Sequence, residues 1–175
     1  MDLLHDGHAP NENDRSVVDA LLKKREPHGA LVRCVYRTFS MGMMNNSDTL
    51  WEATVTRDKK SRTVITLRTK EALRSEKVKK FRPKSDLFAE IEAFVEAENL
   101  AALAALECKP SPFEIMDYSS SAYIALYYED PASKYPDEKT INIQAMQDYG
   151  VDRPADTLHR MITDAIAQKK QRGRL

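Results

Sequence analysis

Residues 50–69 read LWEATVTRDKKSRTVITLRT, and this stretch decides the fold class. Apolar and polar residues alternate from Trp51 to Thr56, as they do in a strand with one buried face. Asp58–Ser61 supplies polar turn residues at the length of a hairpin loop. The β-branched residues of 62–69 are typical of a second strand. The sequence therefore predicts an antiparallel hairpin, with strands at 50–57 and 62–69.

Segments on both sides of this hairpin extend the predicted sheet. Residues 30–40 are rich in β-branched and aromatic residues, which favours a preceding strand. Residues 74–82 (RSEKVKKFR) predict a short, charged edge strand, because lysines at an edge discourage unwanted pairing. A second hairpin is expected from strands at 122–129 and 139–145, joined by the polar turn 130–138. We expect five to six strands, mostly antiparallel.

Three helices are predicted from apolar residues at helical spacing. The first runs from about Asp14 to Arg25 and is capped by Asn13 or Asp14. The second begins at Ser85 as N-cap, and a further turn or two follows at 100–106. The last opens near Asp152, and its first turn holds a proline. The order α-βββ(β)-α-ββ-α predicts an α+β fold of two layers, with the helices on one face of the sheet.

A length of 175 residues fits one domain. We expect a flexible arm at 1–12, a single α+β domain at 13–168 and a basic tail at 169–175. The residues expected to be nearly buried in its core are Trp51, Val55, Ile91, Phe94, Ile124, Leu126, Leu158 and Ile162.

Composition and the ends of the chain narrow the class of protein. Hydrophobic residues make up 42% and charged residues 31%, as in a globular protein. The longest apolar run, 100–106, is far short of the roughly 20 residues that a membrane-spanning helix needs. Residues 1–6 (MDLLHD) lack the basic and apolar regions of a signal peptide, so a cytoplasmic location is expected. Cys34 and Cys108 are too few for a disulfide framework, and Cys34 is expected to be a small buried residue.

Several short segments together resemble a group of small bacterial α+β domains to which no activity is assigned. The resemblance covers roughly residues 30–166 and is carried by Phe39–Met44, Trp51–Glu52, Thr56–Arg57, the helix 86–99 with Leu103 and Leu106, and Tyr118–Ser121. It implies hairpins arranged around one central helix. It implies no catalytic residue.

Charge is strongly segregated along a chain whose net charge is zero. Residues 57–84 contain twelve basic and three acidic residues, whereas residues 85–138 contain two basic and twelve acidic residues. This segregation favours a module that binds a macromolecular partner. This is the most unusual feature of the sequence.

The basic block supplies the candidate binding residues, termed here the basic stripe: Arg57, Lys59, Lys60, Arg62, Arg68, Lys77, Lys79, Lys80 and Arg82. Exposed on a sheet edge, these side chains would contact phosphates. Phe81 is the only aromatic residue of the segment, whereas single-strand binding surfaces usually hold several. The favoured alternative is a solvated edge, or one neutralised by the acidic helix of the same or a neighbouring molecule, through Glu90, Glu92, Glu96 and Glu98.

Motifs that would indicate catalysis, a metal or a cofactor are not evident. No glycine loop has phosphate-binding spacing, and there is neither C-x-x-C nor H-E-x-x-H. His5 and His8 fall in the predicted arm, and His28 and His159 lack cysteines or carboxylates at ligand spacing. Asp117 beside Ser119–Ser121 lacks the elbow of a serine nucleophile. We predict no catalytic residue, metal or cofactor.

Three functions remain open on this basis. The first is a non-catalytic interaction module that binds a protein partner or a second copy of itself. The second is a nucleic-acid-binding protein that uses residues 57–84. The third is an enzyme with an unrecognised site, for example in the loop 41–48. No interaction with a membrane is predicted.

Overall fold

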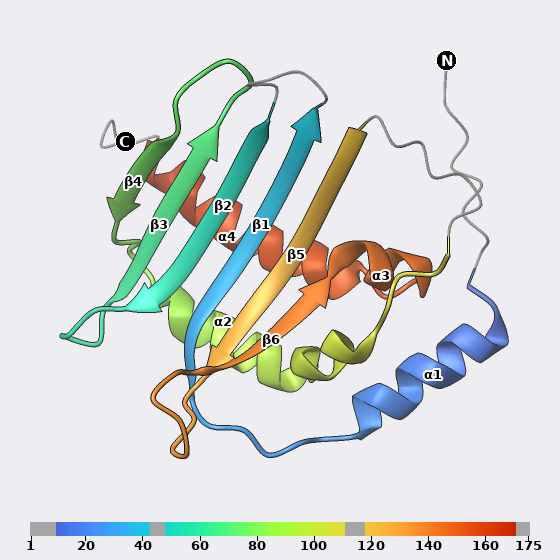
Figure 1. Cartoon of the computed structure of the whole chain (residues 1–175). Coiled ribbons are helices and arrows are strands. Elements are labelled where there is room, and N and C mark those ends of the chain that lie inside the picture. The colour runs from blue at the N-terminus through green and yellow to red at the C-terminus, as the bar shows by residue number, and fades with distance from the viewer. Residues whose placement is uncertain (1–9, 43–47, 111–117, 171–175) are drawn as a thin grey trace.

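A six-stranded antiparallel sheet with the strand order β4-β3-β2-β1-β5-β6 organises the molecule (Figure 1). The computed structural model describes residues 10–42, 48–110 and 118–170. The predicted hairpins are confirmed, and every neighbouring pair of strands is antiparallel. The strands are β1 (Leu31–Gly42), β2 (Thr49–Arg57), β3 (Thr63–Lys70), β4 (Lys77–Phe81), β5 (Tyr118–Tyr128) and β6 (Asp137–Asn142).

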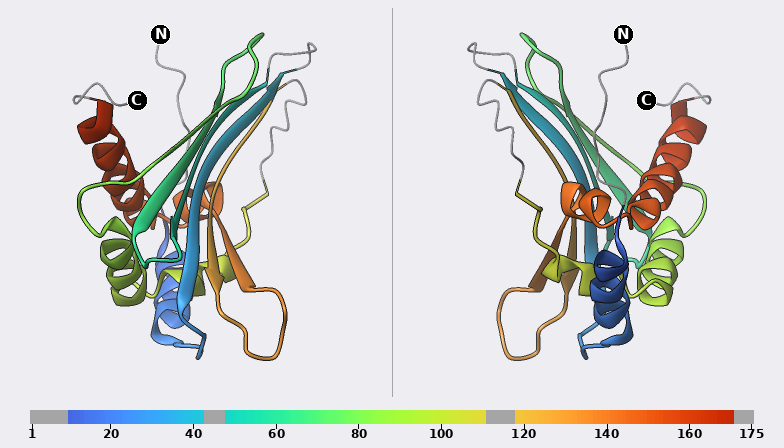
Figure 2. Two further views of the ribbon diagram at one scale, coloured as in Figure 1. Left: turned by 90° about the vertical axis from the view of Figure 1, so that its left-hand side faces the viewer. Right: turned by 90° about the vertical axis from the view of Figure 1, so that its right-hand side faces the viewer.

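Helices cover one face of this sheet, which confirms the predicted α+β architecture. They are α1 (Glu12–Lys23), α2 (Leu87–Ala97), the 3₁₀ helix η1 (Leu100–Ala105), α3 (Ile143–Asp148) and α4 (Arg153–Lys170). The side views show α2 and α4 stacked against the same side of the strands (Figure 2). Within the described residues, no helix combines the length and apolar character needed to cross a membrane.

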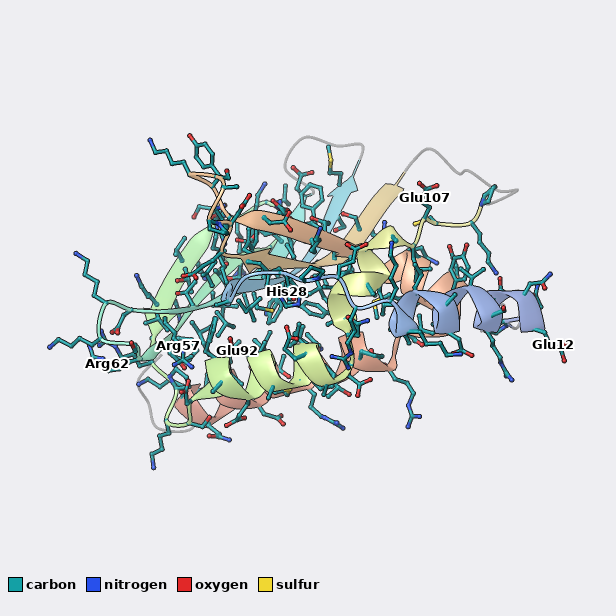
Figure 3. All side chains as sticks on the ribbon, turned by 90° about the horizontal axis from the view of Figure 1, so that it is seen from below. Glu12, His28, Arg57, Arg62, Glu92 and Glu107 are labelled. Atoms are coloured by element: carbon teal, nitrogen blue, oxygen red, sulfur yellow. The ribbon has the colours of Figure 1, made fainter. Side chains whose placement is uncertain are left out.

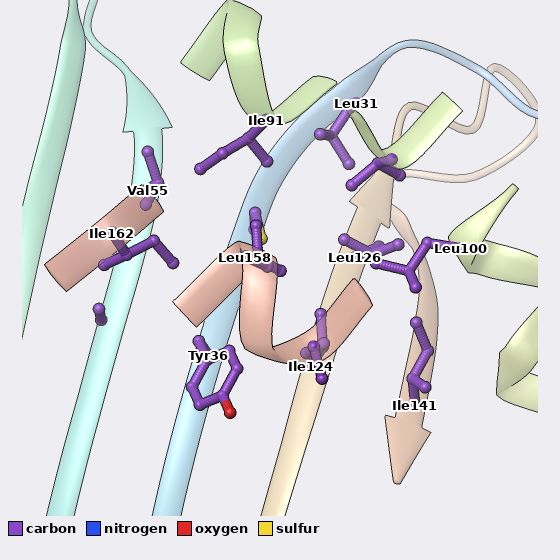
Figure 4. Close-up of a cluster of buried hydrophobic side chains, with 14 of the residues drawn as sticks. Leu31, Tyr36, Val55, Ile91, Leu100, Ile124, Leu126, Ile141, Leu158 and Ile162 are labelled. Atoms are coloured by element: carbon purple, nitrogen blue, oxygen red, sulfur yellow. The ribbon is translucent and has the colours of Figure 1, made fainter. Parts of the chain in front are cut away.

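The core lies between the sheet and the helices (Figure 4). Six of the eight predicted core residues are fully buried: Val55, Ile91, Ile124, Leu126, Leu158 and Ile162. Trp51 and Phe94 are only partly buried, so the prediction is wrong for these two. On α2 the buried residues Leu87, Phe88, Ile91 and Val95 define the inner face, and Phe94 falls at its edge. Trp51 packs at the margin of the core, against the rings of Tyr36 and His159.

Side-chain caps fix where the first two helices begin. Asn11, rather than Asn13 or Asp14, caps α1, because its side chain accepts the Asp14 N–H while the Asp14 carboxylate accepts the Asn11 N–H. This reciprocal pair is a capping box. Asp86, rather than Ser85, caps α2 by accepting the Ala89 N–H. Both helix starts are therefore shifted from their predicted positions by one or two residues.

The segment after β5 differs most from expectation. The strand predicted at 139–145 ends at Asn142, whose side chain accepts the N–H groups of Gln144 and Ala145 and so starts α3. Ile143 is buried in that helix instead of in a strand. At the C-terminal end, α4 continues to Lys170, so Lys169 and Lys170, predicted as part of the basic tail, are helical. Residues 1–9 and 171–175 lie outside the described residues.

Candidate functional site

The face of the sheet turned away from α2 and α4 carries charged and aromatic side chains. Side chains along a strand alternate between the two faces. In β1, Cys34 and Tyr36 join the core, so Arg33, Val35 and Arg37 lie on the opposite side. This side faces the viewer in Figure 1, and none of the described helices covers it. It is termed the open face below.

The centre of the open face contains an arginine stacked on a tyrosine. The register of β1 and β5 places Arg33 opposite Tyr127. The guanidinium carbon of Arg33 lies 3.7 Å from the centroid of the Tyr127 ring. In the described parts of the chain, Arg33 forms no ion pair, and its buried Nε has no hydrogen-bond partner. Burial, and then the nearby charge of Glu138, raise the pKa of the Tyr127 phenol, which therefore stays neutral.

A row of paired side chains crosses β5, β1, β2 and β3 beside this stack. Arg37 Nη1 donates to the Tyr123 hydroxyl at 3.0 Å, and Arg37 Nε lies 3.6 Å from Glu52 Oε2. Arg68 Nη1 lies 3.1 Å from Glu52 Oε1, and Arg68 Nε lies 2.8 Å from Glu76 Oε1. The buried Glu52 carboxylate is thus compensated from two sides, as a buried charge must be. The row holds its members in place and satisfies their charges.

Apolar residues lie beneath these polar groups. Val35 and Ala125 are opposite each other on the open face, and they are 8% and 1% exposed although no described helix covers them. Arg33 and Arg37 flank Val35 along β1 on the same face. Long arginine side chains lay their aliphatic stems over apolar surface and keep the charged end in water. The open face is therefore a packed layer that presents guanidinium and phenol groups.

The arginines of the basic stripe are paired with carboxylates. Arg57 Nη1 lies 3.0 Å from Asp86 Oδ1. Asp58 Oδ2 lies 2.9 Å from Arg62 Nη2 and 3.1 Å from Arg82 Nη2. The fourth arginine of the stripe belongs to the row that crosses the open face. These arginines mainly hold the β2–β3 turn and the start of α2 in position.

The lysines of the basic stripe are distributed over two places. Lys59 and Lys60 are exposed in the turn between β2 and β3. On β4, Lys77 and Lys79 lie on the helix side of the sheet, and Lys80 lies on the open side. Each of the five is exposed and forms no ion pair with any described residue. The nine predicted residues therefore do not form one continuous stripe.

Among the described residues, the glutamates of α2 form no ion pair with the basic stripe. None of the described ion pairs involves Glu90, Glu92 or Glu98, and Glu96 Oε1 instead lies 3.1 Å from His28 Nε2. Figure 3 shows Arg57 and Arg62 at the end of the sheet where α2 begins, with Glu92 further along that helix. Within the chain, Asp86 at the cap of α2 pairs with Arg57, and the other arginines of the stripe pair with carboxylates of the turn and the strands. Neutralisation of the stripe by the glutamates of α2 stays a prediction. Contact with a neighbouring molecule stays a prediction.

Two histidines have structural surroundings that their sequence spacing does not reveal. His28 stacks on Tyr128 at 4.0 Å between ring centroids and lies at a pocket of about 400 Å³ between α1, η1 and β6. His159 packs against Tyr36 and Trp51. No cluster of three or more His, Cys, Asp or Glu side chains suited to a metal occurs among the described residues.

Other candidates from the sequence fall where the structure gives no description. His5, His8 and Asp117 lie outside the described residues, as do 43–47 of the loop considered for an unrecognised active site. Their roles therefore remain sequence-based predictions.

The sequence prediction missed the residues that dominate the open face: Arg33, Arg37, Tyr123 and Tyr127. A usable signal exists, because residues four apart in a strand share a face. This spacing predicts that Arg33 and Arg37 share one face of their strand, and that Tyr123 and Tyr127 share one face of theirs. What it does not reveal is that β1 and β5, which are distant in the chain, are neighbours in the sheet.

Comparisons with known proteins leave the family open. No known protein family matches the sequence, and no curated protein is significantly similar to it. The resemblance of residues 30–166 to small bacterial domains therefore stays a prediction.

Proposed function

We propose that the chain is a non-catalytic binding module that docks a protein partner on the open face of its sheet. The observation that carries this proposal is Arg33, whose guanidinium lies 3.7 Å from the Tyr127 ring centroid and forms no ion pair with the described residues. A planar guanidinium that is held by an aromatic ring is suited to bidentate contact with a carboxylate. We infer that an aspartate or glutamate of the partner completes this contact.

The composition of the open face supports a protein partner. Interface cores are enriched in arginine and aromatic residues, whereas lysine is depleted there. Lys70 and Lys80 lie toward the β3–β4 side of the open face, away from its centre. The residues at the centre of the face are Arg33, Arg37, Phe39, Tyr123 and Tyr127.

The fixed geometry of the face also favours binding. Association costs free energy when side chains must be immobilised. The contacts of Arg37 with Tyr123 and Glu52, and of Arg68 with Glu52, already restrict these side chains in the free chain. A partner that meets this face orders few further groups.

We place the module in the cytoplasm. Cys34 and Cys108 are both free thiols, and a reducing compartment would keep them so. The free thiols give no information about which protein is the partner.

The proposal is tested by capture of partners from a nuclease-treated native lysate with three forms of the chain. These are the wild type, Arg33→Glu, and the matched charge reversal Arg160→Glu on the exposed side of α4. We expect one protein to be captured by the wild type and by Arg160→Glu and to be lost with Arg33→Glu. Arg33→Lys should give intermediate capture, because it keeps the charge but not the planar group. Circular dichroism confirms that each variant is folded.

Capture that is equal for Arg33→Glu and wild type would overturn the proposal, as would capture that disappears with nuclease. Two differently tagged copies of the chain, mixed in the same experiment, test self-association. If the tagged copy is the protein lost with Arg33→Glu, the partner on the open face is a second copy of the chain.

A second candidate function, nucleic-acid binding, is favoured by the five exposed lysines of the basic stripe. Because released counterions drive such binding, affinity for a fluorescent oligonucleotide would fall steeply as salt rises. Salt-sensitive binding that is abolished by replacing Lys77, Lys79 and Lys80 with glutamate would support this candidate. Wild-type chain that binds no oligonucleotide at low salt would eliminate it.

A further inference from the structure

The strand β4 leaves one long edge of the sheet open. The sheet ends at β4 on one side and at β6 on the other (Figure 1). The edge strand β6 is packed beside η1. Across the described residues, the only backbone hydrogen bonds of Lys77–Phe81 are those that pair it with β3. The two edges therefore differ: among the described elements, β6 has η1 beside it, whereas β4 has β3 as its neighbour and is the more open edge.

Strand geometry gives this edge a defined hydrogen-bonding capacity. In an antiparallel pair, alternate residues exchange N–H and C=O bonds with the partner strand. The remaining residues of β4 direct their backbone groups outward, which makes the edge a template for a further strand. All of Lys77, Val78, Lys79 and Lys80 are exposed, and Val78 is 60% exposed.

The lysines determine which strand this template accepts. A second copy of β4 would bring lysines opposite lysines, and like charges across a strand pair are destabilising. An acidic segment instead gains from each of Lys77, Lys79 and Lys80, none of which has a carboxylate partner among the described residues. The same side chains therefore oppose self-pairing and favour an acidic partner.

The alternation of these lysines favours a peptide over a nucleic acid. Lys77 and Lys79 lie on the helix side of the sheet with Phe81, while Lys80 lies on the open side. A peptide strand projects side chains to both sides in turn and can pair with all three lysines. A phosphate backbone follows one surface. Phe81, the one aromatic residue of β4, is 7% exposed and gives a base no ring on which to stack.

We propose that the β4 edge accepts an extended acidic segment of a partner protein as an additional strand. The lysines provide charge complementarity on both faces, and the exposed Val78 provides an apolar contact on the open side. This site lies on a different part of the sheet from the Arg33–Tyr127 stack. A negative result for one site therefore leaves the proposal for the other unaffected.

The probe is a fluorescein-labelled peptide of about eight residues, since strands of this length are common. Its residues are glutamates on both faces of the strand, apart from one valine placed to lie opposite Val78. Its matched control has the same sequence with alternate amides N-methylated, which keeps the charge and removes the strand hydrogen bonds. Anisotropy with the full chain reports binding. Hydrogen exchange then locates protection on Lys77–Phe81.

We expect the N-methylated peptide to bind about tenfold or more weakly, because it loses backbone hydrogen bonds. A chain with Lys77, Lys79 and Lys80 replaced by glutamine should also lose binding, and the Arg33→Glu chain should retain it. Equal binding of both peptides would overturn strand addition, as would no binding of either. Binding of a labelled oligonucleotide but not of the peptide would overturn it in favour of a nucleic-acid surface.

Discussion

The guanidinium carbon of Arg33 lies 3.7 Å from the ring centroid of Tyr127, although the two residues come from strands in opposite halves of the chain. Neighbouring arginines on the open face are already paired with Glu52 and Glu76, whereas Arg33 has no ion pair with any described residue. The pairing of β1 with β5 thus brings an arginine that is stacked on a tyrosine, and that has no ion pair with the described residues, to the centre of an open surface.

If Arg33 serves binding rather than folding, its removal should cost little stability. A cation–π contact that is partly exposed is worth about 0.5–1 kcal/mol. Arg33→Met, which keeps an aliphatic side chain over Val35, should therefore lower the free energy of unfolding by about 1 kcal/mol or less. Urea denaturation measures this value. A loss of about 3 kcal/mol, the size of a core substitution, would show that the residue is structural.

Phe88 is 1% exposed and packs at the start of α2, so its truncation should leave a cavity. Phe88→Ala should lower the free energy of unfolding by about 3–5 kcal/mol. Phe94, at the edge of the same helix face, is the control, and Phe94→Ala should cost clearly less. Equal losses from the two substitutions would contradict the observed orientation of α2 on the sheet.

Local signals were sufficient for most of the fold. Each of these signals lies within one short segment of the sequence. They are the alternation in 50–57, the turn residues Asp58–Ser61 and the helical spacing of apolar residues in α2 and α4. The predicted strand ran beyond the end of β6, because Ile141 and Ile143 fit the residue spacing of a strand as well as that of a helix. The side chain of Asn142 decides the change to α3, and a single capping residue is a weak signal beside two isoleucines.

The candidate site was not predictable in the same way. Its members are single arginines and tyrosines, and the role of each depends on the residue opposite it on the neighbouring strand. Arg37, for example, lies between Tyr123 of β5 and Glu52 of β2. Strand order is set by long-range packing, and no local pattern specifies it. The basic stripe, by contrast, was evident from composition. The sequence did not show that its arginines pair with carboxylates while its lysines form no ion pair with any described residue.

The turn between β2 and β3 should be sensitive to acid through Asp58. Its carboxylate accepts the backbone N–H groups of Arg62 and Lys60 and contacts the guanidinium groups of Arg62 and Arg82. These contacts, led by the Arg62 backbone, hold the pKa of Asp58 well below its usual range. A carboxyl group whose pKa is lowered on folding adds stability above its unfolded pKa, and this stability is lost as the pH falls below that value.

Chemical denaturation of wild type and Asp58→Asn across pH checks this expectation. The difference in the free energy of unfolding should be largest near neutral pH and should shrink as the pH falls below about 4. A difference that stays constant over this range would show that Asp58 contributes no charge-dependent stability.

The two thiols should differ sharply in reactivity. Cys34 is fully buried in β1, and burial raises its pKa to about 12, so its thiolate is scarce at neutral pH. Cys108 is exposed. A thiol-disulfide reagent should modify Cys108 alone in the folded chain and both cysteines in urea, with Cys108→Ser as the control. Rapid modification of Cys34 in the folded chain would contradict the packing of β1.

The most direct test of the central claim is photo-crosslinking from defined positions in living cells or native lysate. A benzophenone amino acid is placed at Thr54 or Thr140 on the open face, or at Ala93 on the exposed side of α2 as a control. We predict that both open-face positions capture the same protein, that Ala93 does not, and that Arg33→Glu abolishes the adduct. Capture from Ala93 alone, or an adduct that persists with Arg33→Glu, would contradict the assignment of the open face as the binding surface.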